Sequence, residues 1–395
     1  MADGHELSLV ATCSRGLENV LAGELARLGY PDTEPGRGSV RWRGDERAVV
    51  RANLWLRSAT RVLVTVADGP AADRVGLYEL ASSVDWEELV APQQTVAVDV
   101  AGKGSGFASA GFAALTVKDA LVDRLRARRG ERPDVDRRDA DVRIHLHLSG
   151  GRAAIALDSS GEQLAHRGYR PRGGPAPLSE ALAAGIVLLA GYDGSRPLLD
   201  PMCGTGTIPI EAALIATGTA PGLQRRFACE RWNFLPAGLL RDERAAARGQ
   251  RHPAQQPVVA SDRDARAVAA TRHNVAAAGV AEAVRIERRD LSELAPPAPG
   301  SLIVSNPPYG VRLGDAASLP SFYRQIGDAL KARAAGSTAW LLVGDRALAG
   351  EVGLRPRRRL VLFNGPIECR LLRFDLYTGR GEPGSVAVSP GRPAL

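Results

Sequence analysis

From residue 179 onward, short apolar segments of strand character alternate with amphipathic helical segments, and this alternation constrains the fold more than any other feature. Such an order is typical of a doubly wound α/β domain, in which helices cover both faces of a mostly parallel sheet. The pattern predicts strands at 197–200, 258–261, 284–288, 302–305, 338–343, 360–363 and 369–376, and helices at 179–189, 207–217, 265–278 and 319–334. Because ligands bind beyond the carboxyl ends of parallel strands, the residues that follow the first four strands are the first candidates for a functional site.

The fourth of these strands runs directly into Asn306-Pro307-Pro308-Tyr309. The two prolines fix φ and cannot continue a ladder, so they hold the Asn306 carboxamide at the tip of the strand. A fixed amide beside the ring of Tyr309 suits a flat heterocycle that bears an exocyclic amino group. An Asn-Pro pair alone is common in surface turns. After a buried strand, the whole motif resembles that of class I methyltransferases that modify amino nitrogens of adenine, guanine or glutamine, and it makes these four residues the catalytic candidates.

A glycine-rich turn, Asp200-Pro201-Met202-Cys203-Gly204-Thr205-Gly206-Thr207, joins the first strand to its helix. Glycines let a ligand approach the backbone closely at this edge of the sheet. The spacing differs from G-x-G-x-x-G, which disfavours a dinucleotide. Asp262 follows the second strand, where a carboxylate can hold two ribose hydroxyls, and Asp290 follows the third, where it can accept from an adenine amino group.

This layout is typical of an S-adenosylmethionine site. The predicted cofactor-binding residues are Asp200, Met202, Gly204, Thr205, Gly206, Asp262, Asp290 and Asn306. Each aspartate, Asp290 included, could instead cap a helix. Cys203 lies in the cofactor turn and not in the substrate loop, so we interpret it as a small packing residue.

The first 160 residues predict two small α/β units. Strands at 7–12, 38–42 and 60–66 alternate with helices at 17–28 and 45–56, an order typical of a ferredoxin-like unit. A second unit has helices at 77–89 and 112–129 and strands at 95–100, 141–148 and 152–157. We therefore expect domains at 1–69, 70–160 and 161–378, with an Arg-rich insertion at 218–256 and a disordered tail at 379–395.

Charge is unevenly distributed along the chain. The net charge is +7; residues 1–100 carry 10 basic and 15 acidic side chains, and residues 101–395 carry 41 and 29. Codon bias in a GC-rich genome is one explanation, because only three of the 51 basic residues are lysine. Binding of a polyanion is the other. The segment 166–170, His-Arg-Gly-Tyr-Arg, is either a solvated linker or a basic hinge that contacts nucleic acid or the cofactor.

These motifs together resemble the THUMP-containing class I methyltransferases, which are bacterial guanine-N2 methyltransferases of large-subunit ribosomal RNA and their transfer-RNA relatives. The resemblance covers nearly the whole chain. It rests on 118–123, 166–170, 176–178, 200–207, 220–222, 306–313 and 364–369. It implies a Rossmann-like methyltransferase domain preceded by ferredoxin-like and THUMP domains. It also implies S-adenosylmethionine as the cofactor and RNA as the partner, contacted by Lys118, Arg167 and Arg170.

Several alternatives stay open from the sequence. The chain ends after one methyltransferase domain, unlike the fused two-enzyme form, so transfer RNA competes with ribosomal RNA as the substrate. A DNA adenine-N6 or protein glutamine methyltransferase would share the Asn306 motif, and a catalytically silent RNA-binding protein is a further alternative. No signal peptide and no apolar stretch long enough to span a membrane is predicted. Four widely separated cysteines favour a reducing cytoplasm and no metal site, and we expect a monomer.

Overall fold

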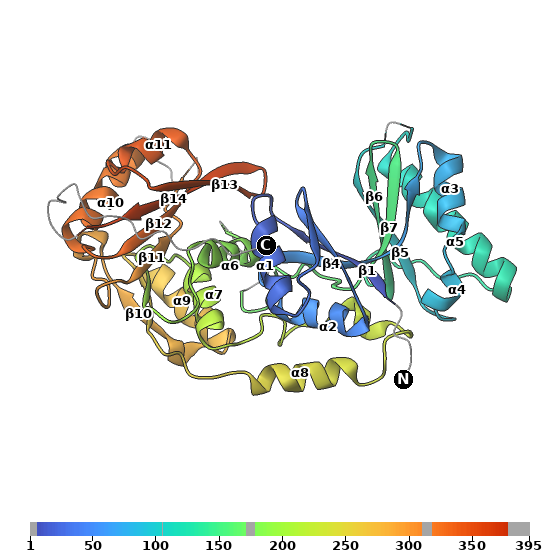
Figure 1. Cartoon of the computed structure of the whole chain (residues 1–395), viewed down its shortest axis with the longest axis horizontal. Coiled ribbons are helices and arrows are strands. Elements are labelled where there is room, and N and C mark those ends of the chain that lie inside the picture. The colour runs from blue at the N-terminus through green and yellow to red at the C-terminus, as the bar shows by residue number, and fades with distance from the viewer. Residues whose placement is uncertain (1–5, 105, 171–177, 310–317, 378–395) are drawn as a thin grey trace.

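The computed structural model describes residues 6–104, 106–170, 178–309 and 318–377, and within them the chain builds two seven-stranded sheets. Figure 1 shows the C-terminal sheet at one end of an elongated molecule and the strands of residues 96–158 at the other, with the strands of residues 7–70, which belong to the same sheet as 96–158, between them. The mixed α/β fold of the two sheets, with a Rossmann-like C-terminal half, is as the sequence predicts. The predicted tail at 379–395 lies outside the described residues.

The N-terminal sheet has the strand order β2-β3-β1-β4-β7-β6-β5. Its strands are β1 (Leu7–Cys13), β2 (Thr33–Gly36), β3 (Ser39–Gly44), β4 (Ala59–Pro70), β5 (Val96–Gly102), β6 (Val142–Ser149) and β7 (Arg152–Asp158). The twelve-residue β4 pairs with β1 on one side and with β7 on the other. The two small units predicted from the sequence therefore share one continuous sheet, which strand-by-strand periodicity does not reveal.

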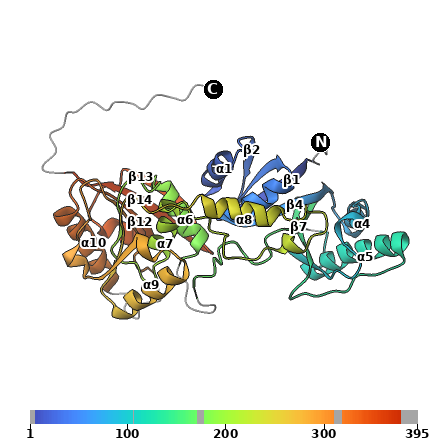
Figure 2. The same ribbon diagram turned by 90° about the horizontal axis from the view of Figure 1, so that it is seen from below.

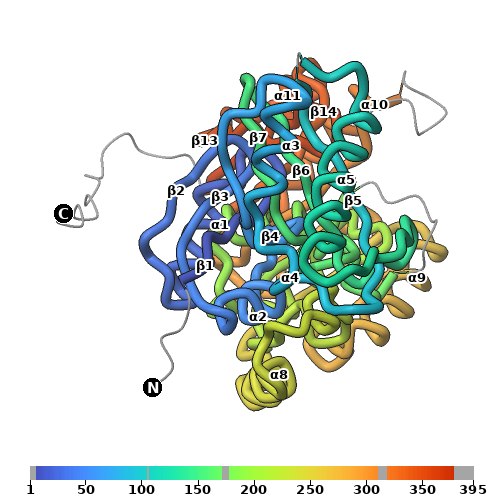
Figure 3. The backbone as a smooth tube through the Cα atoms, turned by 90° about the vertical axis from the view of Figure 1, so that its right-hand side faces the viewer, coloured from blue at the N-terminus to red at the C-terminus, as the bar shows by residue number. Residues whose placement is uncertain are grey.

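Helices cover this sheet in two groups. They are α1 (Glu18–Arg27), α2 (Glu46–Trp55), α3 (Arg74–Ser82), α4 (Trp86–Leu89) and α5 (Ala110–Arg129). The sequence predicts one helix at 77–89, but the structure divides it into α3 and α4, with the Trp86 indole donating to the Ala81 carbonyl across the break. Figure 3 looks onto this end of the molecule, where α3 and α5 lie side by side.

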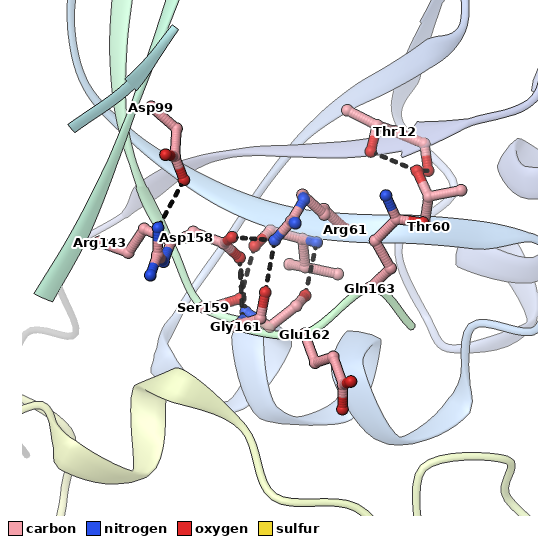
Figure 4. Close-up of polar contacts among 12 residues, drawn as sticks. Thr12, Thr60, Arg61, Asp99, Arg143, Asp158, Ser159, Gly161, Glu162 and Gln163 are labelled. Carbon is pink, nitrogen blue, oxygen red and sulfur yellow. Dashed lines mark hydrogen bonds and ion pairs between the residues drawn. The ribbon is translucent and has the colours of Figure 1, made fainter. Parts of the chain in front are cut away.

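A buried polar junction fastens the chain where it leaves β7. The Arg61 guanidinium on β4 pairs with the Asp158 carboxylate at the end of β7 (Figure 4). Asp158 also accepts hydrogen bonds from the backbone N–H groups of Ser160 and Gly161. The Ser160 hydroxyl in turn accepts from the Val62 N–H. The segment toward the C-terminal half thus begins from a fixed point on the N-terminal sheet.

The C-terminal sheet has the order β10-β9-β8-β11-β12-β14-β13, parallel from β10 to β12 with an antiparallel pair at one edge. Its strands are β8 (Leu198–Asp200), β9 (Val258–Asp262), β10 (Val284–Arg288), β11 (Leu302–Ser305), β12 (Thr338–Val343), β13 (Arg358–Asn364) and β14 (Ile367–Asp375). The principal helices are α6 (Glu180–Leu189), α7 (Thr207–Ala216), α9 (Ala265–Ala277) and α10 (Leu319–Arg333). Two further helices, α8 (Leu239–Gly249) and α11 (Arg346–Glu351), were not predicted.

The two halves are joined by packing as well as by the chain. Leu17, just before α1, is fully buried in the core of the C-terminal half and lies against Gly185 of α6. The insertion contributes α8, which runs alongside α2 (Figure 1; Figure 2 gives the second view of α8), and Arg47 of α2 pairs with Glu243 of α8 at 3.3 Å. The position of the N-terminal sheet relative to the C-terminal sheet is therefore set by side-chain contacts.

Candidate functional site

The carboxyl ends of β8, β9 and β11 meet at one edge of the C-terminal sheet. β8 lies between β9 and β11, and both neighbours run parallel to it. The Ser305 hydroxyl at the end of β11 donates to the Asp200 carboxylate at the end of β8, with an O–O distance of 2.6 Å. Asn306 directly follows Ser305, which is hydrogen-bonded to the first residue of the glycine turn. The predicted substrate motif and the predicted cofactor turn are therefore adjacent.

The glycine turn is held by α9 and has open space above it. Gly206 has φ +85°, and an added Cβ would lie 2.8 Å from Thr271 Cγ2, so this position requires glycine. Gly204 has φ +54°, but a Cβ there would meet no atom within 4 Å. The Thr271 hydroxyl and the Asn274 amide donate to the carbonyls of Gly204 and Thr205 at 2.8 and 2.9 Å. The turn is fixed from below and leaves its upper side free for a ligand.

Asp262 links the second strand to the glycine turn. Its Oδ2 accepts from the Gly204 N–H at 3.0 Å, and its Oδ1 accepts from the Asp264 N–H at 2.9 Å. The side chain is partly exposed at the end of β9. Because a carboxylate oxygen can accept more than one hydrogen bond, both oxygens retain capacity for a ligand's hydroxyl groups.

Asp200 is buried, with 2% of its surface exposed. Burial raises the pKa of Asp200 to about 7, and the hydrogen bonds from Ser305 and from the Met202 N–H oppose that rise. The carboxyl group ties the ends of β8 and β11 together from beneath. Its observed contacts are with the chain itself, and Met202 contributes its backbone N–H to them.

Asp290 caps a short helix, as the alternative interpretation allowed. It precedes the 3-10 turn η3 (Leu291–Glu293), and its Oδ1 accepts from the N–H and the hydroxyl of Ser292 at 2.9 and 2.7 Å. These bonds lower the pKa of Asp290. The exposed Asp290 side chain follows β10 at the same edge of the sheet. Because Oδ1 is used by Ser292, Oδ2 is the oxygen that could accept a hydrogen bond from a cofactor.

The Asn306 side chain presents a buried acceptor that lacks a partner. Its Oδ1 is enclosed and makes no hydrogen bond. Leaving such a group unpaired costs about 1–3 kcal/mol. The described residues contain other buried polar atoms without a partner, but the Asn306 oxygen lies next to the Ser305–Asp200 hydrogen bond at the functional edge of the sheet. A donor that arrives with a ligand would satisfy this oxygen.

The rest of the Asn306 motif is held by side chains that the sequence analysis missed. The Tyr323 hydroxyl on α10 donates to the Pro308 carbonyl at 3.2 Å. Tyr323 is fully buried, and burial raises its pKa, so it stays a neutral donor. The Tyr309 hydroxyl accepts from the Asn364 amide at 3.0 Å. Ser305 precedes the motif, and Asn364 belongs to the segment 364–369 of the resemblance, but nothing in the sequence signals Tyr323.

Two of the three cations predicted to contact RNA, Arg167 and Arg170, have their charged groups engaged by the protein itself. Arg167 is 3% exposed and donates to the carbonyls of Leu164 and Arg57, and its Nε lies 3.6 Å from the Glu211 carboxylate. Arg170 pairs with Glu180 at 2.6 Å, and its side chain is 12% exposed. Both are engaged by the protein because their side chains turn inward, whereas His166 and Gly168 of the same segment are exposed.

Lys118 remains a candidate for an RNA contact. It lies on α5 and lines a groove of about 280 Å³ between α5 and β5, together with Arg137 and Asp99. Its ammonium group pairs with Asp119 at 3.0 Å, and the side chain is 30% exposed. Exposed pairs of this kind contribute little to stability and are readily exchanged for another anion.

No group of three or more His, Cys, Asp or Glu side chains among residues 6–104, 106–170, 178–309 and 318–377 could hold a metal ion. In the same part of the chain, no helix combines the length and the apolar character needed to cross a membrane.

Comparison with protein families gives three matches along the chain. The RlmL ferredoxin-like domain matches residues 8–63, the THUMP domain matches 71–158, and the RMKL-like methyltransferase domain matches 167–373. The ribosomal RNA large subunit methyltransferase K/L of Pseudomonas paraeruginosa is 40% identical over 100% of this chain and 57% of its own length. The chain therefore spans little more than half of that relative. The putative RNA methyltransferase slr0064 of Synechocystis is 37% identical over 93% of this chain and 96% of its own length.

Solved structures give the same picture. A putative methyltransferase, SMU.472, crystallised with SAH, superposes with a TM-score of 0.86 at 28% identity and covers 95% of this chain and 99% of its own. A predicted N6-adenine-specific DNA methylase of Listeria monocytogenes superposes with a TM-score of 0.84 at 30% identity and covers 94% and 96%.

Proposed function

The chain belongs to the RMKL-like methyltransferase family, and on that premise we propose that it transfers a methyl group from S-adenosylmethionine to the exocyclic N2 of a guanine in large-subunit ribosomal RNA. The observation that carries the proposal is the unpaired Asn306 oxygen, which lies one residue beyond the Ser305–Asp200 hydrogen bond. An acceptor of this kind suits an amino group, and a carbon target would leave the amide without a role.

The residues at the strand ends fit the cofactor. Gly204 leaves space where a Cβ would otherwise project, and Asp262 holds acceptor capacity at the rim. We assign Gly204, Thr205 and Gly206 to the approach of the cofactor to the backbone and Asp262 to its ribose. When bound, S-adenosylmethionine supplies an electrophilic methyl group. Asp200 and Met202 support the turn from below.

Within this proposal, the chain's contribution to the chemistry is orientation. The Asn306 oxygen and the Pro307 carbonyl accept the two N–H bonds of the guanine amino group, which directs its nitrogen lone pair toward the methyl donor. Pro308 is fixed by Tyr323, and the ring of Tyr309 provides a face on which the base can stack. Orientation alone can supply roughly 7–11 kcal/mol of a barrier. No protein nucleophile is needed, and burial raises the pKa of the nearby Cys203 thiol, which keeps it protonated.

The THUMP half supports RNA as the partner. RNA helices are recognised largely through shape and phosphate contacts, and base modification requires the target to leave its stack. Lys118 in the groove beside α5 is the cation that we assign to RNA. Transfer RNA is the runner-up substrate. The similarity to the predicted N6-adenine-specific DNA methylase of Listeria makes DNA adenine the third.

The experiment is nucleoside mass spectrometry of ribosomal RNA, transfer RNA and DNA from a strain that lacks this gene, followed by mapping of the missing methyl group. We expect loss of N2-methylguanosine from large-subunit RNA. Expression of the wild-type protein should restore the modification, and the Asn306→Ala variant should not. Loss from transfer RNA alone, or from DNA alone, would replace the proposed substrate with that nucleic acid.

A further inference from the structure

The Tyr309 hydroxyl is fixed by the hairpin at the edge of the C-terminal sheet. β13 ends at Asn364, which pairs with Ile367 across a tight turn that contains Gly365 at φ +60°. The Asn364 amide donates to the Tyr309 hydroxyl at 3.0 Å, and Cys369 Sγ lies 3.7 Å from the same oxygen. A residue 55 positions away in the sequence thus holds the outer end of the substrate motif.

The ring of Tyr309 has a second fixed point. It rests on the backbone of Gly344, which directly follows β12, and a Cβ added at Gly344 would lie 2.3 Å from Tyr309 Cδ2. Only glycine lets the ring come so close. With its hydroxyl held by the hairpin and its edge against Gly344, the half-buried ring is restricted to one orientation.

The hairpin is itself supported by the N-terminal half. The Arg15 guanidinium lies 4.0 Å from the centre of the Phe363 ring. A Cβ at Gly16 would lie 2.4 Å from the Val361 carbonyl oxygen, so the loop between β1 and α1 presses directly on β13. These contacts end one residue before Asn364. A continuous set of contacts therefore runs from the N-terminal sheet through β13 to Tyr309.

We propose that Asn364 is a positioning residue for methyl transfer, acting through the Tyr309 hydroxyl to hold the stacking ring against the target base. The inference rests on the proposed function, in which Tyr309 receives the base. If Asn364 has this role, the hairpin connects the substrate loop to the N-terminal half, because the same hairpin contacts Tyr309 on one side and the loop between β1 and α1 on the other. Asn364 sets the geometry of the transfer step and contributes nothing to cofactor binding.

The test uses the full-length protein with ribosomal RNA and compares single-turnover transfer rates. Asn364→Leu keeps the size of the side chain but removes the hydrogen bond, and we expect the rate to fall about tenfold, since small misplacements of reacting groups carry large kinetic costs. The RNA KM and the cofactor Kd should change less than about twofold, because the contacts that determine affinity lie elsewhere. Asn364→Asp can accept a hydrogen bond from the Tyr309 hydroxyl and should restore most of the rate. Ile367→Thr, on the same hairpin but exposed, is the matched control and should behave as wild type.

A double-mutant cycle locates the effect. If Asn364 acts through the Tyr309 hydroxyl, Tyr309→Phe should lower the rate to a similar extent, and adding Asn364→Leu should change it no further. Full additivity of the two changes would overturn the proposal, as would an Asn364→Asp variant that folds but is as slow as Asn364→Leu. If the Leu variant does not fold, the Asp variant and Tyr309→Phe decide the matter. Failure of the wild-type protein to methylate any RNA would instead overturn the proposed function.

Discussion

The two sides of the functional edge of the C-terminal sheet, the glycine turn and the end of β11, differ in how completely their polar groups are paired. On the glycine-turn side, the Gly204 and Thr205 carbonyls and the Asp262 carboxylate all have hydrogen-bond partners within the protein. On the β11 side, the Asn306 Oδ1 is buried without one. A fully paired turn keeps its shape without a ligand, whereas an unpaired acceptor is satisfied only when a donor arrives. The cofactor side is therefore preorganised, and the substrate side completes its hydrogen bonding on binding.

The strongest test of this contrast is Asn306→Ala. We expect the transfer rate to fall about 10²–10³-fold, comparable to the loss of one aimed hydrogen-bonding group in other active sites. The cofactor Kd should change little, because the paired glycine turn is untouched. The thermal stability should not fall, since the change removes a buried atom that has no partner. Single-turnover kinetics, calorimetry and thermal unfolding measure the three quantities. A parallel loss of cofactor binding would contradict the division between the two sides.

The buried carboxyl group of Asp200 tests the cofactor side through pH. Burial raises its pKa to about 7, so the folded protein holds a proton there that the unfolded chain releases near pH 4. The stability contributed by this proton is present below about pH 4 and is lost as the pH rises toward 7. Asp200→Asn removes that dependence, so its free energy of unfolding should exceed that of the wild type by a few kcal/mol at pH 8 and by much less at pH 4.5. Chemical denaturation of the ligand-free protein at the two pH values measures the difference. An equal effect at both values would show that the carboxyl group ionises normally.

Substitution of Asp262 should have a smaller effect than Asn306→Ala, and it should act on cofactor affinity and not on the transfer rate. Its carboxylate is paired with the glycine turn but retains acceptor capacity, so Asp262→Ala should weaken cofactor binding by about 10–100-fold, the value of a hydrogen bond to a charged group. The transfer rate at saturating cofactor should change only slightly. Calorimetry measures the first quantity and single-turnover kinetics the second. Ser292→Ala, which removes one donor to the cap residue Asp290, is a control at the same sheet edge. A loss of rate without a loss of affinity would place Asp262 on the substrate side.

The sequence predicts the elements that obey local rules and misses those set by contact between distant segments. Buried strands, the glycine turn and the Asn306 motif are readable because apolar periodicity and glycine or proline positions are local. The sharing of one sheet by the first two units depends on β4 pairing with β7, which lies about 90 residues away. Tyr323 lies 15 residues from Pro308 and reaches it only once α10 has packed.

Arg167 and Arg170 show that the sequence also does not reveal the partner of a charged side chain when that partner comes from a distant segment. A basic segment indicates charge but not the partner of that charge. Arg167 is enclosed because its guanidinium meets backbone carbonyls, and the buried Glu211 lies behind it. The acidic partners come from α6 and α7, and no spacing rule connects those helices to the segment. Burial therefore has to be known before a cation can be assigned to a polyanion.

The smallest expected effect concerns two cations, Lys118 and Arg170, which differ in how deeply their ion pairs are buried. Lys118 pairs with the exposed Asp119 and is itself partly exposed, whereas Arg170 pairs with the nearly buried Glu180. Lys118→Gln should weaken RNA binding a few-fold and reduce the slope of log affinity against log salt by about 0.7–0.9, the contribution of one phosphate contact. Arg170→Gln should leave that slope unchanged. It should instead lower the thermal stability, because the nearly buried Glu180 carboxylate loses its charged partner. Binding titrations at several salt concentrations separate the two. If the Arg170 variant alone changed the slope, the Arg170–Glu180 pair would have to open when RNA binds. RNA binding would then involve a conformational change that exposes a cation held in the interior of the free protein.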